Sequence, residues 1–162
     1  MQRVIVDTGP LIAWFDASDE FHAMVVDYFR GYAGQLLSTW PVLTEVCHLL
    51  PEHLCADFLR WVGRGGVTVI DVPSSALLVM ADRIDKYADL PMDLADASLI
   101  WLAEAQGVLE VLTLDQRDFG IYRTERGQAL INLLFEAPGG RLLRPLKPTR
   151  PVTGSPARRP KR

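Results

Sequence analysis

The fold is decided by the stretch Arg3-Val4-Ile5-Val6-Asp7-Thr8-Gly9-Pro10-Leu11 at the beginning of the chain. Its β-branched run, residues 4–6, predicts a short strand that is covered on both faces. Thr8 is a favourable helix cap and Pro10 suits a first helical turn, so a helix is expected to follow. Asp7 then stands at the carboxyl end of a strand, where parallel α/β sheets bind ligands, and it is either a cap or part of a site.

The composition is that of an ordinary globular protein. Its 162 residues are enough for one domain, with 49% hydrophobic and 23% charged residues. The apolar runs are too short to span a bilayer, and Asp7, Gly9 and Pro10 interrupt the first of them too early for a signal peptide. Cys47 and Cys55 indicate no disulfide framework. We therefore expect a cytoplasmic protein without a membrane partner.

Charge divides the chain into two parts. Residues 1–140 carry 9 basic and 20 acidic side chains, a net charge of −11, whereas the segment from Arg141 onward has eight Lys and Arg and no acid. The acidic part is not a typical DNA-binding composition, although an acidic surface is also common in proteins that bind no cation. We predict a folded domain over 1–137 and an irregular or disordered basic tail, rich in Pro and Gly, over 138–162.

Hydrophobic periodicity predicts strands alternating with helices. Helical spacing follows the first strand and continues over 20–32, from 39 to 50, from 51 to the glycines at 63–66, and over 74–88 and 94–105. Strands are expected at 35–38, 67–72, 109–114 and 129–135. This order predicts a three-layer α/β/α domain with a mainly parallel central sheet. In the 74–88 helix the expected inward residues are Leu77, Leu78, Met80, Ala81, Ile84 and Tyr87.

Three further acids share the placement logic of Asp7. Asp115 also follows a strand, Glu45 lies on the apolar stripe of its helix, and Asp96 lies in the first turn of the most apolar helix. Simpler interpretations exist for each region. Glu45 is equally well explained as a residue at the edge of its helix with its carboxylate in water. Asp93 is a suitable N-cap, and Asp96 would then simply lie beside the positive end of that helix. Asp118 is placed to cap a short turn.

Four carboxylates brought together without a cation would repel one another, and some would be forced to protonate. Carboxylate oxygens are the ligands of Mg²⁺ or Mn²⁺, and Mg²⁺ held in this way can activate water for a phosphodiester displacement. Asp7, Glu45, Asp96 and Asp115 are therefore candidate metal ligands.

Four short motifs in this order resemble the PIN-domain nucleases, and most closely the small ribonuclease toxins of the VapBC toxin–antitoxin systems. The resemblance covers roughly residues 1–136. It rests on Val-Asp-Thr-Gly-Pro-Leu-Ile-Ala (6–13), Leu-Thr-Glu-Val (43–46), Leu-Ala-Asp-Ala-Ser-Leu-Ile (94–100) and Thr-Leu-Asp-Gln-Arg-Asp-Phe (113–119).

The resemblance implies a Mg²⁺-dependent endoribonuclease that acts on RNA, with Mn²⁺ as the other suitable cation. It implies a homodimer that a cognate antitoxin protein inhibits. It also implies roles for the motif residues: Asp7, Glu45, Asp96 and Asp115 as the catalytic and metal-binding acids, Asp93 and Asp118 as adjacent acids, and Thr8 and Thr113 as donors that orient the carboxylates.

Other readings are weaker or remain open. Asp-Thr-Gly also occurs in aspartic proteases, whose fold is almost entirely β, and a haloacid-dehalogenase-like phosphatase would need an acid where Gly9 stands. A zinc site built from Cys47, His48, His53 and Cys55 lacks the usual spacing and is expected to lie on helix faces that point apart.

A catalytically inactive PIN-like module that binds RNA or protein, or a processing nuclease that is not a toxin, remains as an alternative. Clustered negative charge does not favour a pure RNA-binding surface. Arg117, Arg123 and Arg126 are candidate phosphate contacts, with solvated loop charge as an equally good reading.

Overall fold

A computed structural model of the chain describes residues 1–135. The tail predicted for 138–162 lies outside the described residues. The strands form one five-stranded sheet in the order β3-β2-β1-β4-β5, and every neighbouring pair is parallel. The bounds of the strands are β1 Arg3–Val6, β2 Gln35–Thr39, β3 Thr68–Ile70, β4 Glu110–Leu112 and β5 Ile131–Asn132.

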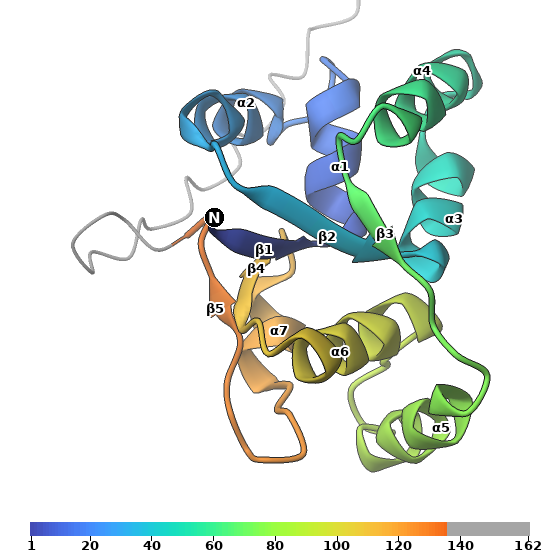
Figure 1. Ribbon diagram of the computed structural model, residues 1–162. Helices are drawn as coiled ribbons and strands as arrows, with labels where there is room; N and C mark the ends of the chain where they lie inside the picture. Colours follow the sequence, from blue (N-terminus) through green and yellow to red (C-terminus); the bar gives the residue numbers. More distant parts are fainter. Residues whose placement is uncertain (136–162) are drawn as a thin grey trace, which may run out of the picture.

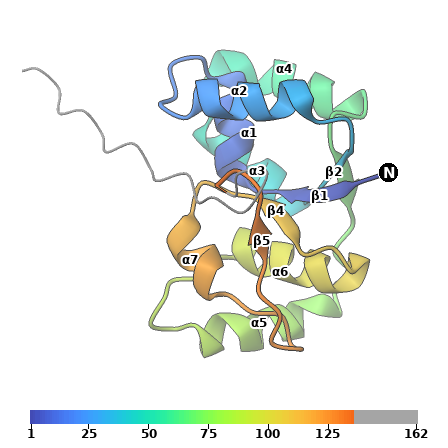
Figure 2. The same cartoon turned by 90° about the vertical axis from the view of Figure 1, so that its left-hand side faces the viewer.

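Helices cover both faces of this sheet, so the three-layer α/β architecture is confirmed. Figures 1 and 2 show α1, α2 and α4 over one face, with α6 and α7 on the other face and α5 outside α6. Helix α3 packs against α1 and α4 and also reaches α6. The helices are α1 Thr8–Phe15, α2 His22–Gly31, α3 Trp40–Leu49, α4 Glu52–Gly63, α5 Ala76–Lys86, α6 Leu94–Gln106 and α7 Gln116–Ile121.

The core is centred on β1, as its β-branched sequence predicts. Val4, Ile5 and Val6 are fully buried, because the strand lies in the middle of the sheet and helices cover it on both sides. Helix α6 buries most of its length against the sheet, which explains why its sequence is apolar nearly all round. The last strand, predicted over 129–135, is only two residues long.

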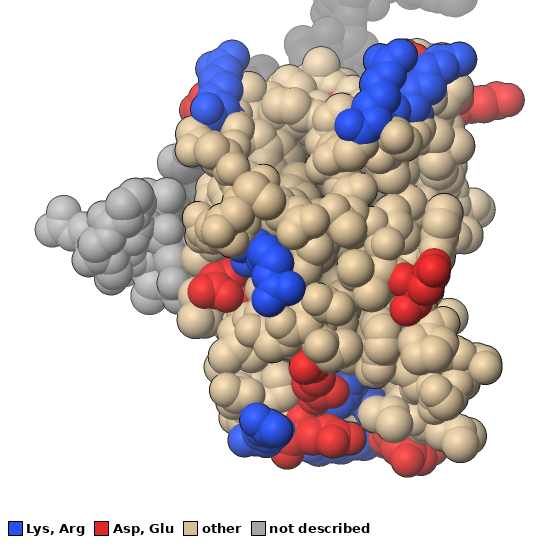
Figure 3. All heavy atoms as spheres, in the orientation of Figure 1, with Lys and Arg blue, Asp and Glu red and all other residues tan. Residues whose placement is uncertain are grey.

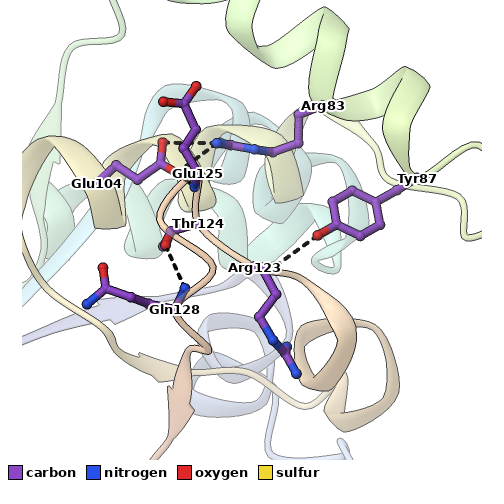
Figure 4. A network of polar contacts seen from close by, with 7 residues as sticks. All are labelled: Arg83, Tyr87, Glu104, Arg123, Thr124, Glu125 and Gln128. Atoms are coloured by element: carbon purple, nitrogen blue, oxygen red, sulfur yellow. Dashed lines mark hydrogen bonds and ion pairs between the residues drawn. The ribbon is translucent and has the colours of Figure 1, made fainter.

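The predicted inward face of α5 was wrong in part. Leu77 is 49% exposed and Leu78 is 76% exposed, whereas Ala76, Met80 and Arg83 are buried. The buried stripe begins one residue earlier than expected, and within it the Arg83 guanidinium faces α6. There it pairs with the Glu104 carboxylate, 2.8 Å away (Figure 4).

The direction in which successive strands are added to the sheet changes at β1, in the centre of the sheet. From β1 the sheet extends through β2 to β3 on one side and through β4 to β5 on the other. The carboxyl ends of β1, β2 and β4 therefore meet at one edge, where open α/β sheets form a ligand-binding crevice.

Charged side chains are unevenly distributed over the surface. Figure 3 shows basic side chains over α2 and α4 at one end of this face, and basic and acidic side chains together at the opposite end around α5, with a mostly uncharged surface between them. Among residues 1–135, none of the helices is long and apolar enough to cross a bilayer.

Candidate active site

Asp7 lies between β1 and α1 and is only 9% exposed. One carboxylate oxygen accepts the N–H of Thr8 at 2.7 Å, and the other accepts the hydroxyl of Thr113 at 2.7 Å. The backbone of Asp7 is extended, so Asp7 itself is the N-cap of α1. The prediction that Thr8 caps this helix was wrong, because Thr8 is already the first helical residue.

The Thr8 side chain has a different partner. Its hydroxyl donates a hydrogen bond to the Glu45 carboxylate on α3, so the first turn of α1 is tied to the middle of α3. Gly9 allows this turn to approach the loop after β4, since a Cβ at Gly9 would lie 3.1 Å from Leu114 Cδ1. Glu45 is half-buried and therefore points toward the site and not fully into water.

Asp96 and Asp93 occupy the first turn of α6. Asp93 is the N-cap, as the simpler interpretation predicts, and its carboxylate accepts the Asp96 N–H at 2.9 Å. The Asp96 carboxylate is half-buried and accepts the Tyr122 hydroxyl at 3.3 Å. The Asp96 carboxylate therefore faces the buried Tyr122 side chain, while Asp93 is exposed.

Asp115 lies on the exposed rim of the same edge. Its N–H donates to the Thr113 hydroxyl at 3.0 Å, which links it to Asp7 through a single side chain. Its carboxylate accepts the Asp118 N–H at 2.9 Å and caps α7. The reading of Asp118 as the cap of this turn was therefore wrong, because Asp118 lies in the first turn of α7.

The carboxylates influence one another electrostatically. Burial chiefly raises the pKa of Asp7 to about 6, aided by the charges of Glu45 and Asp93 and opposed by hydrogen bonds from Thr113 and Thr8. The pKa of Asp96 is raised to about 7, again chiefly by burial and then by the charges of Asp93 and Asp7. The structure therefore brings Asp7, Glu45, Asp93 and Asp96 into one electrostatic neighbourhood.

Within the described residues, no Lys or Arg forms an ion pair with these carboxylates. The ion pairs within residues 1–135 join Arg30 to Asp27, Arg60 to Asp57, Arg83 to Glu104 and Arg117 to Asp118. None of these pairs includes Asp7, Glu45, Asp93 or Asp96.

A divalent cation suits this donor set, because its charge would stabilise the buried, ionised carboxylates and offset their mutual repulsion. In the described part of the chain, however, no three Asp, Glu, His or Cys side chains are already grouped as metal ligands. The chemistry of the donors fits a cation, and the carboxylates would have to adjust around it.

Sequence reasoning missed two residues that support the site. Tyr122 is fully buried and its hydroxyl reaches Asp96. The Asn132 side chain donates to the Thr113 carbonyl at 2.9 Å and accepts the Thr113 N–H at 3.4 Å. A lone amide in the apolar run 130–135 was the available signal for Asn132, since a polar group there needs a specific partner.

The three predicted arginines differ in what they contact. The Arg123 guanidinium donates to the carbonyls of Gly120 and Tyr122, both at 2.8 Å, and so binds the end of α7. Its backbone N–H donates to the Tyr87 hydroxyl (Figure 4). The Arg117 side chain is 82% exposed, and Arg126 is also exposed. Contact of these residues with RNA stays a prediction.

The cysteines do not point apart as expected. Burial and the neighbouring Cys55 thiol raise the pKa of Cys47, so the two side chains lie near each other between α3 and α4. Both thiols are free. No zinc-binding group of three or more ligands is present in residues 1–135.

Comparison with known proteins supports the resemblance inferred from the motifs. The chain is 29% identical over 124 residues to Ribonuclease VapC26 of Mycobacterium tuberculosis, covering 74% of this chain and 92% of the relative. No family model matches the chain.

The fold is also found in a solved structure. The crystal structure of VapC20 from Mycobacterium tuberculosis, described as a sarcin–ricin loop cleaving toxin, superposes with a TM-score of 0.66 at 13% sequence identity. The match covers 72% of this chain and 93% of VapC20. The sequence match and the shared fold therefore support the resemblance to VapC-type PIN-domain proteins that the ordered motifs indicate.

Proposed function

We propose that this protein is a metal-dependent endoribonuclease that hydrolyses RNA phosphodiester bonds at the carboxylate cluster around Asp7. The observation that carries the proposal is the grouping of buried Asp7 with half-buried Glu45 and Asp96, none of which has a Lys or Arg partner in residues 1–135. Burial raises the pKa of Asp7 and of Asp96. Buried carboxylates without a cation lower the stability of the fold, so such a cluster is typical of a functional site that binds a cation. The similarity to Ribonuclease VapC26 supports RNA as the substrate.

Asp7, Glu45, Asp96 and Asp115 would hold the cation, with Mg²⁺ or Mn²⁺ as the suitable ions. The ion supplies activation of water and stabilisation of the charge that develops on the phosphate. Thr113 and the Thr8 N–H fix both oxygens of Asp7, while the Thr8 hydroxyl orients Glu45. Asp93 and Asp118 add negative charge beside these ligands, which strengthens attraction for a cation.

The protein is further proposed to be the toxin of a toxin–antitoxin pair, to be inhibited by a cognate antitoxin, and to form a homodimer. These proposals rest on the similarity to VapC proteins. Light scattering on the purified chain measures its mass directly, and a monomeric mass at all concentrations would contradict the dimer.

RNA cleavage by the wild type and by Asp7→Asn tests the proposed activity. Structured RNAs are incubated with each protein in Mg²⁺ or in EDTA. We expect cleavage only by the wild type with Mg²⁺. Asp27→Asn is the matched control, because Asp27 is an exposed acid on α2 that pairs only with its neighbour Arg30 within the described residues. Equal cleavage by Asp7→Asn would reject this site, and RNA binding without any cleavage would favour an inactive module.

Expression in a bacterial host separates a toxin from a processing nuclease. A toxin should arrest growth when the wild type is induced, whereas Asp7→Asn should not. Co-expression of the protein encoded next to it should restore growth. Normal growth with a protein that cleaves RNA in vitro would contradict the toxin proposal and favour a processing enzyme.

A further inference from the structure

An apolar groove adjoins the carboxylate cluster at the edge of the sheet. It lies between one face of α3, from Trp40 to His48, and the start of α6, and has a volume of about 580 Å³. Glu45 and Asp93 line the side shared with the candidate active site. The rest of the lining is apolar at Trp40, Pro41, Leu94 and Ala95 and polar at Thr44 and His48. A molecule bound at the carboxylates would therefore extend directly into this groove.

Trp40 is held in an unusual position for a tryptophan. It is 55% exposed, yet its indole N–H donates to the Asp71 carboxylate at 2.8 Å. The preceding residue, Thr39, is fully buried and bonds the Ser98 hydroxyl at 2.6 Å, which fixes the backbone from which Trp40 projects. Leu94, which opens α6, is also 47% exposed. Exposed apolar side chains that are fixed in place and grouped together are typical of binding surfaces.

The lining determines which part of an RNA can enter. Among residues 1–135, no Lys or Arg lines this groove, and its shared wall carries the Glu45 and Asp93 carboxylates, which would repel a phosphate. A nucleobase is neutral and presents a flat π-face, and single-stranded RNA is commonly bound by stacking on aromatic side chains. An acidic active site without Lys or Arg side chains of its own cannot bind RNA through ion pairs with the phosphates. Stacking of a neutral base is a source of affinity that remains.

We propose that this groove is a subsite for an unpaired RNA base next to the cleaved phosphodiester, with Trp40 as the stacking surface. The inference rests on the proposed ribonuclease function, because it takes RNA as the substrate. Asp71 is a positioning residue in this arrangement, since it holds the indole ring without touching the base.

Binding of fluorescein-labelled, unstructured RNA decamers in EDTA tests the subsite without requiring cleavage. Stacking on one aromatic ring contributes about 5- to 150-fold in affinity. Trp40→Ala should weaken binding by this factor, whereas Trp40→Phe should retain most of it because a ring remains. Leu49→Ala is the matched control on the same helix, with a side chain that is 56% exposed, and its affinity should equal that of the wild type.

An abasic nucleotide placed at each position of the decamer in turn identifies the stacked base. At one position the abasic nucleotide should weaken binding to the wild type but not to Trp40→Ala, because that variant lacks the indole ring on which the base would stack. Circular dichroism verifies that the variant is folded. Unchanged RNA affinity of folded Trp40→Ala would overturn the subsite. This holds even if the variant bound a partner protein more weakly, because the groove would then be a protein-binding surface.

The two proposals fail separately. If Trp40→Ala binds RNA weakly while the wild type cleaves no RNA in Mg²⁺, base binding in the groove stands, but the nuclease function and the position of the base beside a cleaved bond fall. If the wild type cleaves RNA and Trp40→Ala binds and cleaves it equally well, the nuclease function stands and the subsite falls.

Discussion

At the scale of the residue, Asp7 combines the two roles that the sequence presents as alternatives, a helix cap and a part of the carboxylate cluster. Its carboxylate caps α1 through the Thr8 N–H, and its other oxygen accepts the Thr113 hydroxyl. These bonds lower its pKa but do not offset burial, which raises the pKa to about 6. Capping therefore fixes the carboxylate at the sheet edge, but its ionised form is still destabilised by burial and would be stabilised by a nearby cation.

The raised pKa values of Asp7 and Asp96 predict how stability depends on pH without metal. Between pH 4 and pH 7 the folded protein binds more protons than the unfolded chain, so its free energy of unfolding falls as pH rises. From pH 5 to pH 8 we expect a loss of about 1–3 kcal/mol from these groups in EDTA.

Urea unfolding at the two pH values measures this loss. Asp7→Asn should show a smaller loss than the wild type, while the exposed-site control Asp27→Asn should match the wild type. Added Mg²⁺ should restore stability to the wild type at pH 8. An equal pH dependence in Asp7→Asn and the wild type would show that Asp7 does not titrate in this range.

Thr113 is the residue that connects two of the candidate ligands. Thr113→Val keeps the shape of the side chain but removes the donor to Asp7 and the acceptor for the Asp115 N–H. We expect the RNA cleavage rate to fall about 10- to 100-fold, as is usual when a residue that orients metal ligands is lost. The free energy of unfolding should fall by about 1–2 kcal/mol.

Thr124→Val is the matched control for Thr113→Val. Thr124 is also buried, and its hydroxyl accepts the Gln128 N–H in a loop away from the carboxylates (Figure 4). This variant should lose similar stability but keep its cleavage rate. Equal losses of rate in both variants would assign the effect to general destabilisation.

The candidate acids could be predicted from residue type and position in the sequence, whereas their hydrogen-bond partners could be identified only in the folded structure. Asp7 and Asp115 could be located because both follow strands, and Asp93 because it precedes an apolar helix. Which of Asp7 and Thr8 caps α1 depends on one pair of backbone angles, and either residue type is a good cap. Tyr122 was missed because its contact with Asp96 joins segments 26 residues apart.

At the scale of the element, α5 shows the limit of hydrophobic periodicity. Apolar residues occupy two faces of this helix, and only the face with Ala76, Met80 and Arg83 is buried. A buried arginine is contrary to the hydrophobic pattern, and its partner Glu104 lies on a different helix. The sequence alone does not indicate this pairing, so the facing side was assigned incorrectly.

The Arg83–Glu104 pair is predicted to stabilise the packing of α5 on α6. Arg83 is 6% exposed, and Glu104 also accepts the Glu125 N–H at 2.6 Å (Figure 4). Arg83→Leu leaves this half-buried carboxylate without its cation, so we expect a loss of about 3–5 kcal/mol in the free energy of unfolding. Urea denaturation measures the change.

The double variant Arg83→Leu/Glu104→Gln provides the control. The amide of Gln keeps an acceptor for the Glu125 N–H and removes the unpaired charge, so part of the lost stability should return. In contrast, Arg60→Leu breaks an exposed pair and should change stability by less than about 1 kcal/mol. A similarly small change in Arg83→Leu would contradict the importance of the buried pair.

At the scale of the whole molecule, the sheet order explains why distant acids meet. Alternation of strands and helices predicted a parallel sheet and a shared edge for the strand ends, and both are present. The order β3-β2-β1-β4-β5 could not be predicted from spacing, because it depends on which face each connecting helix covers. This order makes β1 central and places Asp7 at the middle of the edge.

The predicted domain boundary is tested by shortening the chain to residues 1–137. Residues 1–135 contain all five strands of the sheet and the buried core around β1. We expect the shortened protein to unfold within about 2 °C of the full chain, because its core is unchanged. Calorimetry measures the difference, and a molten or insoluble shortened chain would contradict a domain that ends at 137.

A divalent cation held by Asp7 and its neighbouring carboxylates is the point on which the proposed chemistry depends. Electron paramagnetic resonance of free Mn²⁺ measures this binding directly in the wild type, Asp7→Asn and the control Asp27→Asn. The wild type and Asp27→Asn should both remove Mn²⁺ from solution at stoichiometric concentration, whereas Asp7→Asn should bind it at least 10-fold more weakly. Equal Mn²⁺ binding by folded Asp7→Asn and the wild type would contradict the proposed site.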